Sequence, residues 1–258
     1  MRARRPLLLS ALGVGLALAG GAGCTPGPIE VAALPSDSLT NGMVAHWAFD
    51  EDSGTVADDG SGNGRTGFIA NPNPGWIKMG QFASALHFSG VDYVSVQGMP
   101  RATPSYSVSA WVLIQPYEVG APIANIISTE SLGGGWALYA TLGPGSETWV
   151  FRFAMNAAQQ YVYASCACVV TGAWTHLAAV VDGDASTLTF YVNGVGMPVT
   201  TEGAAILPGS ATLYLARSAE LSPTFNLTGA VDDVAIYSRA LVPQEVAALG
   251  QAAAPNPQ

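Results

Sequence analysis

The chain has few charged residues, and those it has are mostly acidic. Charged side chains make up 10% of the 258 residues, and 9 lysines and arginines stand against 18 aspartates and glutamates, for a formal net charge of −9. A chain this acidic lacks the electrostatic surface that nucleic acid requires, and it has no basic patch for an anionic membrane. Its excess of carboxylates is compatible with solubility and with cation binding.

Cysteine is scarce, and the common metal and catalytic motifs are missing. The three cysteines show neither a CxxC nor a Cys/His zinc spacing, and the sequence has no G-x-S-x-G elbow and no H-E-x-x-H. One residue separates Cys166 from Cys168, a spacing at which a disulfide is strained and uncommon, so we expect two buried or weakly oxidised thiols there and no metal site. The histidines, His46, His87 and His176, lie in separate apolar runs, and we expect them to be structural.

The N-terminus has the layout of a secretory signal peptide. Arg2, Arg4 and Arg5 precede the apolar run PLLLSALGVGLALAGG, which ends at Gly21, and the small residues Ala22 and Gly23 follow directly before Cys24. A basic segment, an apolar segment and a small-residue cleavage site predict a signal peptide over residues 1–23. The run is too short and too rich in glycine for a membrane span. Its removal leaves 258 − 23 = 235 residues with 9 − 3 = 6 basic and 18 acidic side chains, a formal charge of −12.

The end of this segment, GAGC, resembles the lipobox of bacterial lipoproteins. In that family the cysteine becomes the lipidated first residue of the mature chain, which here would be Cys24. The resemblance implies a protein secreted across the inner membrane and lipid-anchored to the outer membrane, at the cell surface or the periplasmic face, with no other membrane contact. Gly21 stands where the family usually has leucine. Cleavage nearby without lipidation, which leaves a soluble secreted protein, is the alternative.

The rest of the chain predicts one β domain. Glycine and proline number 30 and 17, a composition typical of turn-rich β proteins. Residues 24–40 have no apolar periodicity and predict a tether. Over residues 41–250, short apolar runs such as MVAHWAF, YSVSAWVLI and WVFRFAM alternate with turn signals, which favours an antiparallel sandwich. One segment, PQEVAALG, has Pro243 and Gly250 at positions typical of helix ends, and residues 251–258 are expected to be disordered.

Five motifs follow one another along residues 41–249. They are GMVAHWAFDEDSGTVADDGSGNGRTG, ALHFSGVDYVSV, YSVSAWV, WTHLAAVVDGDASTLTFYVNG and GAVDDVAIYSRALVPQEVAAL. Their order resembles the laminin G-like jelly-roll domains of bacterial secreted proteins, within the concanavalin A-like lectin and glucanase superfamily. The resemblance implies an all-β fold, a two-sheet antiparallel jelly-roll sandwich with one short C-terminal helical segment. It also implies a structural calcium ion, which many members contain.

Calcium takes about six to eight oxygen ligands, and two segments are dense in them: FDED, which contains Asp50, and DDGSGNG, which contains Asp59 and Asn63. Asp59 aligns with the first residue of the family's D-x-S-G-N-G pattern. Asp232 aligns with the aspartate that commonly ligates calcium in the last strand. We therefore predict a calcium site of Asp50, Asp59, Asn63 and Asp232. The alternative for DDGSGNG is a plain turn, because Asp, Asn, Ser and Gly all favour turns.

The last of the five motifs carries two adjacent carboxylates, Asp232 and Asp233, in an apolar run. Successive side chains of a regular strand point to opposite faces, so one carboxylate shares a face with Val234 and Ile236. A carboxylate removed from water needs a partner. We expect Asp232 to meet the cation and Asp233 to face solvent or a loop.

The resemblance is compatible with several functions, and the absence of paired catalytic carboxylates helps to distinguish them. A retaining glycosidase needs two carboxyl groups about 5–5.5 Å apart, yet the E-x-D-x-E motif of laminarinase-like members is absent and the runs YSVSAWVLI, WALYATL and WVFRFAM contain no acid. We predict a non-catalytic module, not an enzyme, that binds a glycan or a surface or extracellular protein. A secreted polysaccharide hydrolase or lyase on the same fold, and a structural surface protein, are the alternatives. Residues available for stacking on sugars, none of them assigned, are Trp136, Tyr139, Trp149, Tyr161, Tyr163 and Tyr191, with Arg152 and Asn193.

Overall fold

The computed structural model describes residues 34, 37–71, 75–78, 80–100, 103–115, 123–129, 134–142, 149–157, 160–201, 210–218 and 226–251. All of them belong to one unit of the chain that begins at Leu34. The predicted signal peptide, Cys24, most of the predicted tether and residues 252–258 of the predicted tail lie outside the described residues. Within the described part, no helix is long and apolar enough to cross a membrane.

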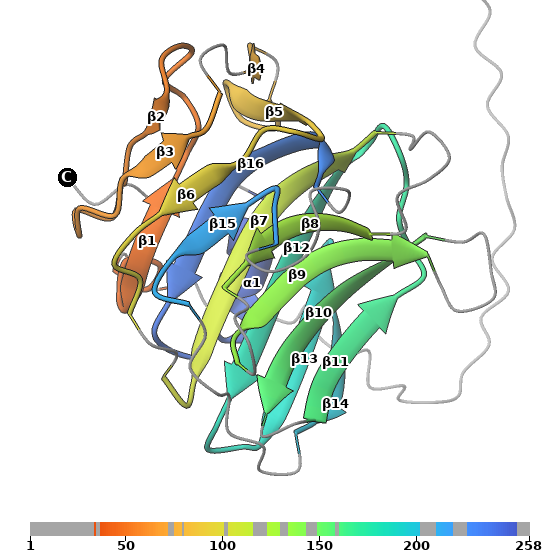
Figure 1. Cartoon of the computed structure of the whole chain (residues 1–258). Coiled ribbons are helices and arrows are strands. Elements are labelled where there is room, and N and C mark those ends of the chain that lie inside the picture. The colour runs from red at the N-terminus through yellow and green to blue at the C-terminus, as the bar shows by residue number, and fades with distance from the viewer. Residues whose placement is uncertain are drawn as a thin grey trace, which may run out of the picture. The chain divides into compact units, whose positions relative to one another are not determined.

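Two antiparallel sheets face one another (Figure 1). Sheet A has the order β14-β13-β12-β7-β16-β5-β4, and β1 also pairs with β16. Its strands are β1 (Met43–Trp47), β4 (Gly75–Ile77), β5 (Ala85–Ser89), β7 (Tyr106–Ile114), β12 (Trp174–Asp182), β13 (Thr187–Val192), β14 (Val195–Thr200) and β16 (Thr228–Tyr237).

Sheet B has the order β11-β10-β9-β8-β15-β6-β3-β2. Its strands are β2 (Val56–Ala57), β3 (Gly67–Ile69), β6 (Val94–Val96), β8 (Ile123–Ser128), β9 (Trp136–Leu142), β10 (Trp149–Ala157), β11 (Gln160–Cys166) and β15 (Leu213–Leu215). The predicted all-β, two-sheet antiparallel sandwich is therefore confirmed.

The core lies between the sheets because the strands alternate. On β7, Val108, Ala110 and Val112 point inward, and on β10, Phe151 and Phe153 meet them from the opposite sheet; all five side chains are fully buried. Burial of a large apolar side chain such as valine or phenylalanine stabilises a fold by about 1.5–3 kcal/mol. Side chains alternate between the two faces of a strand, so the residues between these core positions point to the outer faces of the sheets.

The outer face of sheet A is covered in part by the single helix, α1 (Pro243–Leu249). Val246 and Leu249 of the helix belong to a second buried cluster with Val180 of β12 and Tyr237 of β16. This confirms the predicted short C-terminal helix. Sheet B has no such helix, since α1 is the only helix among the described ranges.

A polar contact ties the helix to the start of the described chain. The Arg239 guanidinium donates to both carboxylate oxygens of Glu245, at 2.7 and 2.8 Å, and to the carbonyls of Ser38 and Asn41. The Ser38 hydroxyl also donates to Glu245. Residues 37–40, the end of the predicted tether, therefore form a turn against the domain.

Cys166 and Cys168 form a disulfide, so the expectation of two thiols was wrong. β11 ends at Cys166, and a bend at Ala167 follows. The bend brings the two Cα atoms to 5.2 Å, a separation usual for disulfides. The prediction assumed an extended chain here, and the strand had already ended.

Candidate functional site

Asp232 and Asp233 lie where β16 changes partner. On one side β16 pairs with β5 through residues 228–231 and with β1 through residues 234–237, while β7 runs along the other side. The register with β7 shifts between Asp232 and Ala235, and Asp233 has a φ of 48°, which is uncommon for residues other than glycine. We call this bulge, at Asp232 and Asp233, the β16 junction.

Both junction carboxylates are buried. Asp232 is 0% exposed and Asp233 is 3% exposed, so the expectation that Asp233 faces solvent or a loop was wrong. That expectation rested on strict alternation, which a β-bulge interrupts. Asp233 is instead paired: its Oδ1 accepts a hydrogen bond from His46 Nε2 of β1 at 2.6 Å. His46 is thereby a buried, partnered strand histidine, as predicted.

Asp232 is less well satisfied. Its Oδ2 accepts the Phe82 backbone N–H at 2.9 Å, and its Oδ1 is buried without a hydrogen-bond partner. Burial, followed by repulsion from the Asp233 and Asp50 carboxylates, raises the pKa of Asp232 to about 7 despite the backbone hydrogen bonds. A side chain at Gly80 would not fit beside it, because a Cβ there would lie 2.8 Å from Asp232 Oδ2 and 2.2 Å from the Ser84 carbonyl oxygen.

Asp50 approaches the same junction from the end of β1. Its Oδ1 accepts the Ser84 backbone N–H at 3.0 Å, and the Ser84 hydroxyl donates to Asp52. The segment from Gly80 to Ser84 therefore lies between the FDED sequence and Asp232. Of the four predicted calcium ligands, these contacts bring Asp50 and Asp232 together.

Asp59 and Asn63 are held by main-chain contacts of their own. Asp59 accepts the backbone N–H groups of His46, Ser61 and Arg65 at 3.0, 2.9 and 2.8 Å. Burial would raise the pKa of Asp59, but hydrogen bonds to its carboxylate outweigh burial and lower it. Asn63 Nδ2 donates to the Met43 and Val44 carbonyls. The loop is thus pinned to β1, and the described residues include no cluster of three or more His, Cys, Asp or Glu arranged to hold a metal.

The outer face of sheet B carries a row of aromatic and small side chains. The row becomes apparent when the cross-strand partners are followed from strand to strand. Cross-strand partners share a face, and one row of partners crosses seven strands from β3 to β11. Its members, in order, are Phe68, Ser95, Tyr214, Ser128, Ala137, Ala154 and Tyr163. Small residues thus lie in the middle of the row, and aromatic residues stand on both sides of them.

Two arginines lie over the tyrosines of this face. Arg152 is the cross-strand partner of Tyr139, and its Cζ lies 4.7 Å from the ring centre of Tyr163. Arg217 lies 4.6 Å over Tyr93 and 5.8 Å over Tyr214, whose rings are 6.0 Å apart. Tyr163 is 52% exposed. We call the six residues Tyr93, Tyr139, Arg152, Tyr163, Tyr214 and Arg217 the tyrosine–arginine patch.

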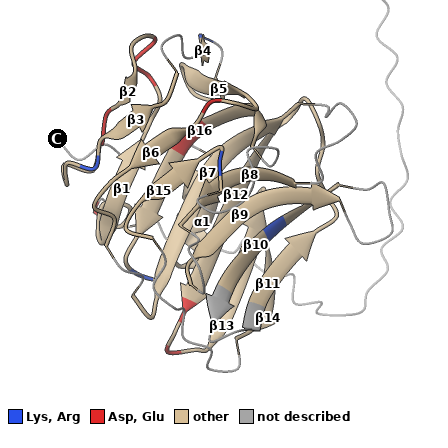
Figure 2. Ribbon diagram, in the orientation of Figure 1, with Lys and Arg blue, Asp and Glu red and all other residues tan. Residues whose placement is uncertain are grey.

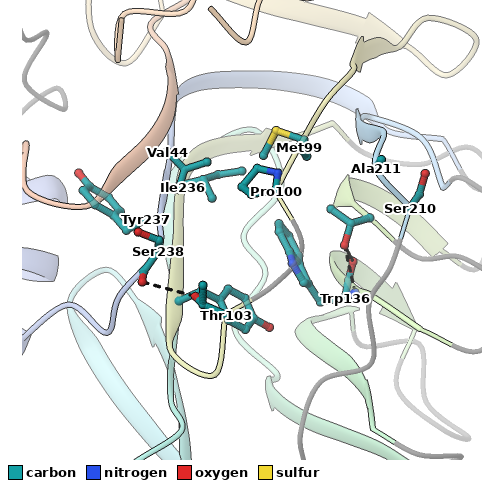
Figure 3. Close-up of a pocket in the computed structure, with 12 residues that line it drawn as sticks. Val44, Met99, Pro100, Thr103, Trp136, Ser210, Ala211, Ile236, Tyr237 and Ser238 are labelled. Carbon is teal, nitrogen blue, oxygen red and sulfur yellow. Dashed lines mark hydrogen bonds between the residues drawn. The ribbon is translucent and has the colours of Figure 1, made fainter. Parts of the chain in front are cut away.

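A cavity of about 230 Å³ opens between the sheets beside Met99 and Pro100 (Figure 3). Tyr106, Trp136 and Ile236 are among the apolar side chains of its wall. The Tyr106 hydroxyl is buried without a partner, and burial raises its pKa. Among the described residues that line this cavity there is no Asp, Glu, His or Cys.

Comparison with protein families identifies the fold family. Residues 88–247, more than half of the chain, match a laminin G model described as the concanavalin A-like lectin/glucanases superfamily. The chain belongs to this superfamily. Among curated proteins, no sequence matches the chain significantly.

Solved structures with this concanavalin A-like fold include two toxin domains and one domain of an enzyme. The ligand binding domain of botulinum neurotoxin serotype D, in complex with N-acetylneuraminic acid, is 15% identical with a TM-score of 0.67, over 83% of this chain and 52% of that chain. The binding domain of botulinum neurotoxin DC, in complex with rat synaptotagmin II, is 15% identical with a TM-score of 0.64, over 82% and 52%. Domain 4 of the extracellular arabinanase AbnA from Geobacillus stearothermophilus, in complex with arabinotriose, is 23% identical with a TM-score of 0.57, over 81% and 98%.

The chain spans about half the length of the toxin domains that it matches. At these identities the likeness shows the concanavalin A-like fold alone.

Only part of the predicted sugar-stacking set lies on the open face of this concanavalin A-like domain. Trp136 is buried in the core, Tyr191 belongs to the cluster under α1, and Asn193 accepts the His176 backbone N–H in a turn. Trp149 packs partly against the core, and the side chain of Tyr161 lies outside the description. Tyr139, Arg152 and Tyr163 remain.

Sequence reasoning missed three residues of the patch, Tyr93, Tyr214 and Arg217. The signal for Tyr214 was present, because Leu213 and Leu215 on either side are core residues and a period of two then places the tyrosine on the outer face. Tyr93 and Arg217 lie just outside β6 and β15. The alternation of side chains along a strand does not predict the direction of side chains beyond its ends.

The buried Asp232 predicts an unusual pH dependence. Because its folded-state pKa of about 7 exceeds the ordinary 3.8, its contribution to stability is full below pH 4 and is lost as the pH rises through 7. In buffer free of divalent cations, Asp232→Asn should therefore be more stable than the wild type at pH 8, by on the order of 3 kcal/mol. Urea unfolding at pH 4, 6 and 8 measures this difference.

The matched control is Asp184→Asn, in an exposed turn, which should follow the wild-type profile. Identical pH profiles for the wild type and Asp232→Asn would contradict the analysis of the junction.

Proposed function

We propose that this protein is a non-catalytic binding module that holds a glycan on the outer face of sheet B. The observation that supports this function best is the tyrosine–arginine patch. Tyrosine rings offer flat apolar faces with a polar tip, and sugars present apolar faces edged with hydroxyl groups. Arginine donors beside the rings supply the few placed polar groups that fix a ligand's orientation.

The dimensions of the row suit a short oligosaccharide. Tyr214 on β15 and Tyr163 on β11 are four strand spacings apart, or about 19 Å at roughly 4.8 Å per spacing. Ser128, Ala137 and Ala154 lie between them and leave the larger side chains to make the contacts. The AbnA domain in complex with arabinotriose and the toxin domain in complex with N-acetylneuraminic acid support glycans as the ligand class. The toxin domain in complex with synaptotagmin makes a protein partner the second candidate.

The distribution of acids supports binding without hydrolysis. None of the eight described strands of sheet B contains Asp or Glu, whereas glycosidases commonly use a pair of carboxyl groups across the scissile bond. In Figure 2 the acidic segments lie on sheet A and in loops, and sheet B carries the blue segment of Arg152 on β10. A hydrolase that uses this face would have no carboxyl pair from the described strands of sheet B.

Loss of one tyrosine should weaken glycan binding. Tyr163→Ala and Tyr214→Ala each remove a stacking surface worth about 1.5–3 kcal/mol, and we expect affinities at least tenfold lower for either variant. A glycan array identifies the ligand, and titration calorimetry then compares the variants.

The control for these variants is Val195→Ala, at an exposed position of sheet A, which should bind like the wild type. Absence of any glycan ligand, or equal affinity of wild type and both tyrosine variants, would reject this function.

We also propose a structural calcium ion at the β16 junction. The support is the buried, unpartnered Asp232 Oδ1, together with the nearby Asp50 carboxylate. Both are hard oxygen ligands of the kind calcium prefers. Asp50 and Asp232 would hold the ion, which would offset the repulsion between the carboxylates. Asp59, also predicted as a ligand, fits less well because main-chain N–H groups already bond both of its carboxylate oxygens. Asn63, the fourth predicted ligand, is held against β1 through its Nδ2 donor.

Calcium should therefore raise the melting temperature. A ligand at one hundred times its dissociation constant stabilises the folded state by about 2.7 kcal/mol, or roughly 5–10 °C at 2–4 °C per kcal/mol for a domain of this size. Asp232→Asn should lose this response and Asp59→Asn should keep most of it, as calorimetry with chelator and with calcium would show. Equal melting of the wild type under both conditions would argue against the ion.

We further propose that the chain is exported and lipid-anchored to the outer membrane through Cys24. The support is the sequence of residues 1–24, outside the described structure. Cys24→Ser should abolish acyl labelling and release the protein from membranes. Membrane association that persists in this variant would rule out the anchor.

A further inference from the structure

We infer that the tyrosine–arginine patch selects acidic glycans, whose carboxylate or sulfate groups bind Arg152 and Arg217. This inference rests on the proposed glycan-binding function and adds the ligand's charge to it. Its basis is an uncompensated pair of cations on one face of an acidic protein.

The charges on this face run against those of the whole chain. The protein carries 18 acidic and 9 basic residues, yet the strands of sheet B have no acid (Figure 2). Asp92, next to Tyr93 in sequence, is buried and accepts hydrogen bonds from the Ser89 backbone N–H and hydroxyl. A neutral ligand would not require acidic residues to be kept away from its binding face. An anion that approaches an acidic protein requires a locally positive surface.

Neither patch arginine is neutralised within the described part of the chain. The ion pairs found there are His46–Asp233 and Arg239–Glu245. In both Arg152 and Arg217 the Nε donor is buried without a hydrogen-bond partner. Because these Nε atoms are buried, an acidic group would bind the terminal nitrogen donors of each guanidinium.

The tyrosine rings orient the guanidinium groups for this task. Each guanidinium carbon lies over a ring, 4.7 Å above Tyr163 for Arg152 and 4.6 Å above Tyr93 for Arg217. A cation held at a ring face keeps its positive charge, because the ring contributes only a quadrupole. The planar fork of donors then remains for a carboxylate or sulfate, which arginine can bind through two parallel hydrogen bonds.

The spacing of the arginines favours a polymer over a single acidic sugar. Three strand spacings separate β10, which carries Arg152, from β15, which ends just before Arg217, or about 14 Å at roughly 4.8 Å per spacing. One glycan chain with repeated acidic groups can meet both arginines at once, and the second contact then forms at a high effective concentration.

The test compares matched charged and neutral polysaccharides with the whole protein by titration calorimetry. Polygalacturonate and its fully methyl-esterified form differ in the carboxylate, and dextran sulfate and dextran differ in the sulfate. We expect at least one charged polymer to bind ten times or more tightly than its neutral partner, and its affinity to fall as salt rises. The pair with the larger ratio identifies the acidic group, and inorganic sulfate alone should bind weakly because it cannot use the rings.

The variants Arg152→Gln and Arg217→Gln should each reduce the charged-to-neutral ratio at least fivefold and leave binding to the neutral polymer unchanged. Lys78→Gln removes the same charge at an exposed position just after β4 of sheet A and should keep the ratio. Arg152→Lys keeps the charge without the planar fork, so it should restore the ratio only in part. The wild-type ratios stand even if a variant fails to fold.

Several results would overturn the inference. Equal binding of charged and neutral polymers by the wild type would do so and would leave the proposed glycan-binding function standing. A charge preference that survives both arginine variants, or that Lys78→Gln reduces equally, would show non-specific attraction and not this site. Failure to bind any of the four polymers or any arrayed glycan would reject the proposed function together with the inference.

Discussion

The β16 junction is the constraint on which the sandwich depends. β16 pairs with β7 along one side and with two different strands, β5 and β1, along the other. Where one partner ends and the other begins, the backbone ladder is interrupted, and side chains must replace it. Asp233 accepts a hydrogen bond from His46 of β1, and Asp232 accepts a hydrogen bond from the Phe82 backbone N–H. The carboxylates therefore hold together three segments that are distant in sequence.

This arrangement leaves the two sheets with different chemical characters. Sheet A gathers the buried carboxylates at its centre and carries α1 on its outer face. Sheet B has no acid in its strands and presents tyrosines and arginines. Buried charge is costly unless partnered, and the described strands of sheet B contain only neutral and basic residues.

Much of the fold follows from alternation in the sequence, while the sites depend on features that alternation does not encode. Regular strands such as β7 and β10 place their core residues as a period of two requires, and Asp232 is buried as that pattern predicts. Asp233 departs from it because a bulge adds a residue to one side of a ladder, and no local signal marks the bulge. The aromatic row depends on register across strands as distant as β3 and β11, which a single sequence leaves open.

Arg239 and Arg152 differ in role because different side chains contact them. Arg239 lies against Glu245, which accepts two of its hydrogen bonds and cancels its charge, so the pair fastens α1 to the turn at residues 37–40. Arg152 lies against a tyrosine ring, which holds the guanidinium in place without accepting its in-plane donors or neutralising it. A carboxylate in the place of that ring would make a stronger bond and leave nothing for a ligand. On sheet B, aromatic side chains therefore orient the two arginines without neutralising them.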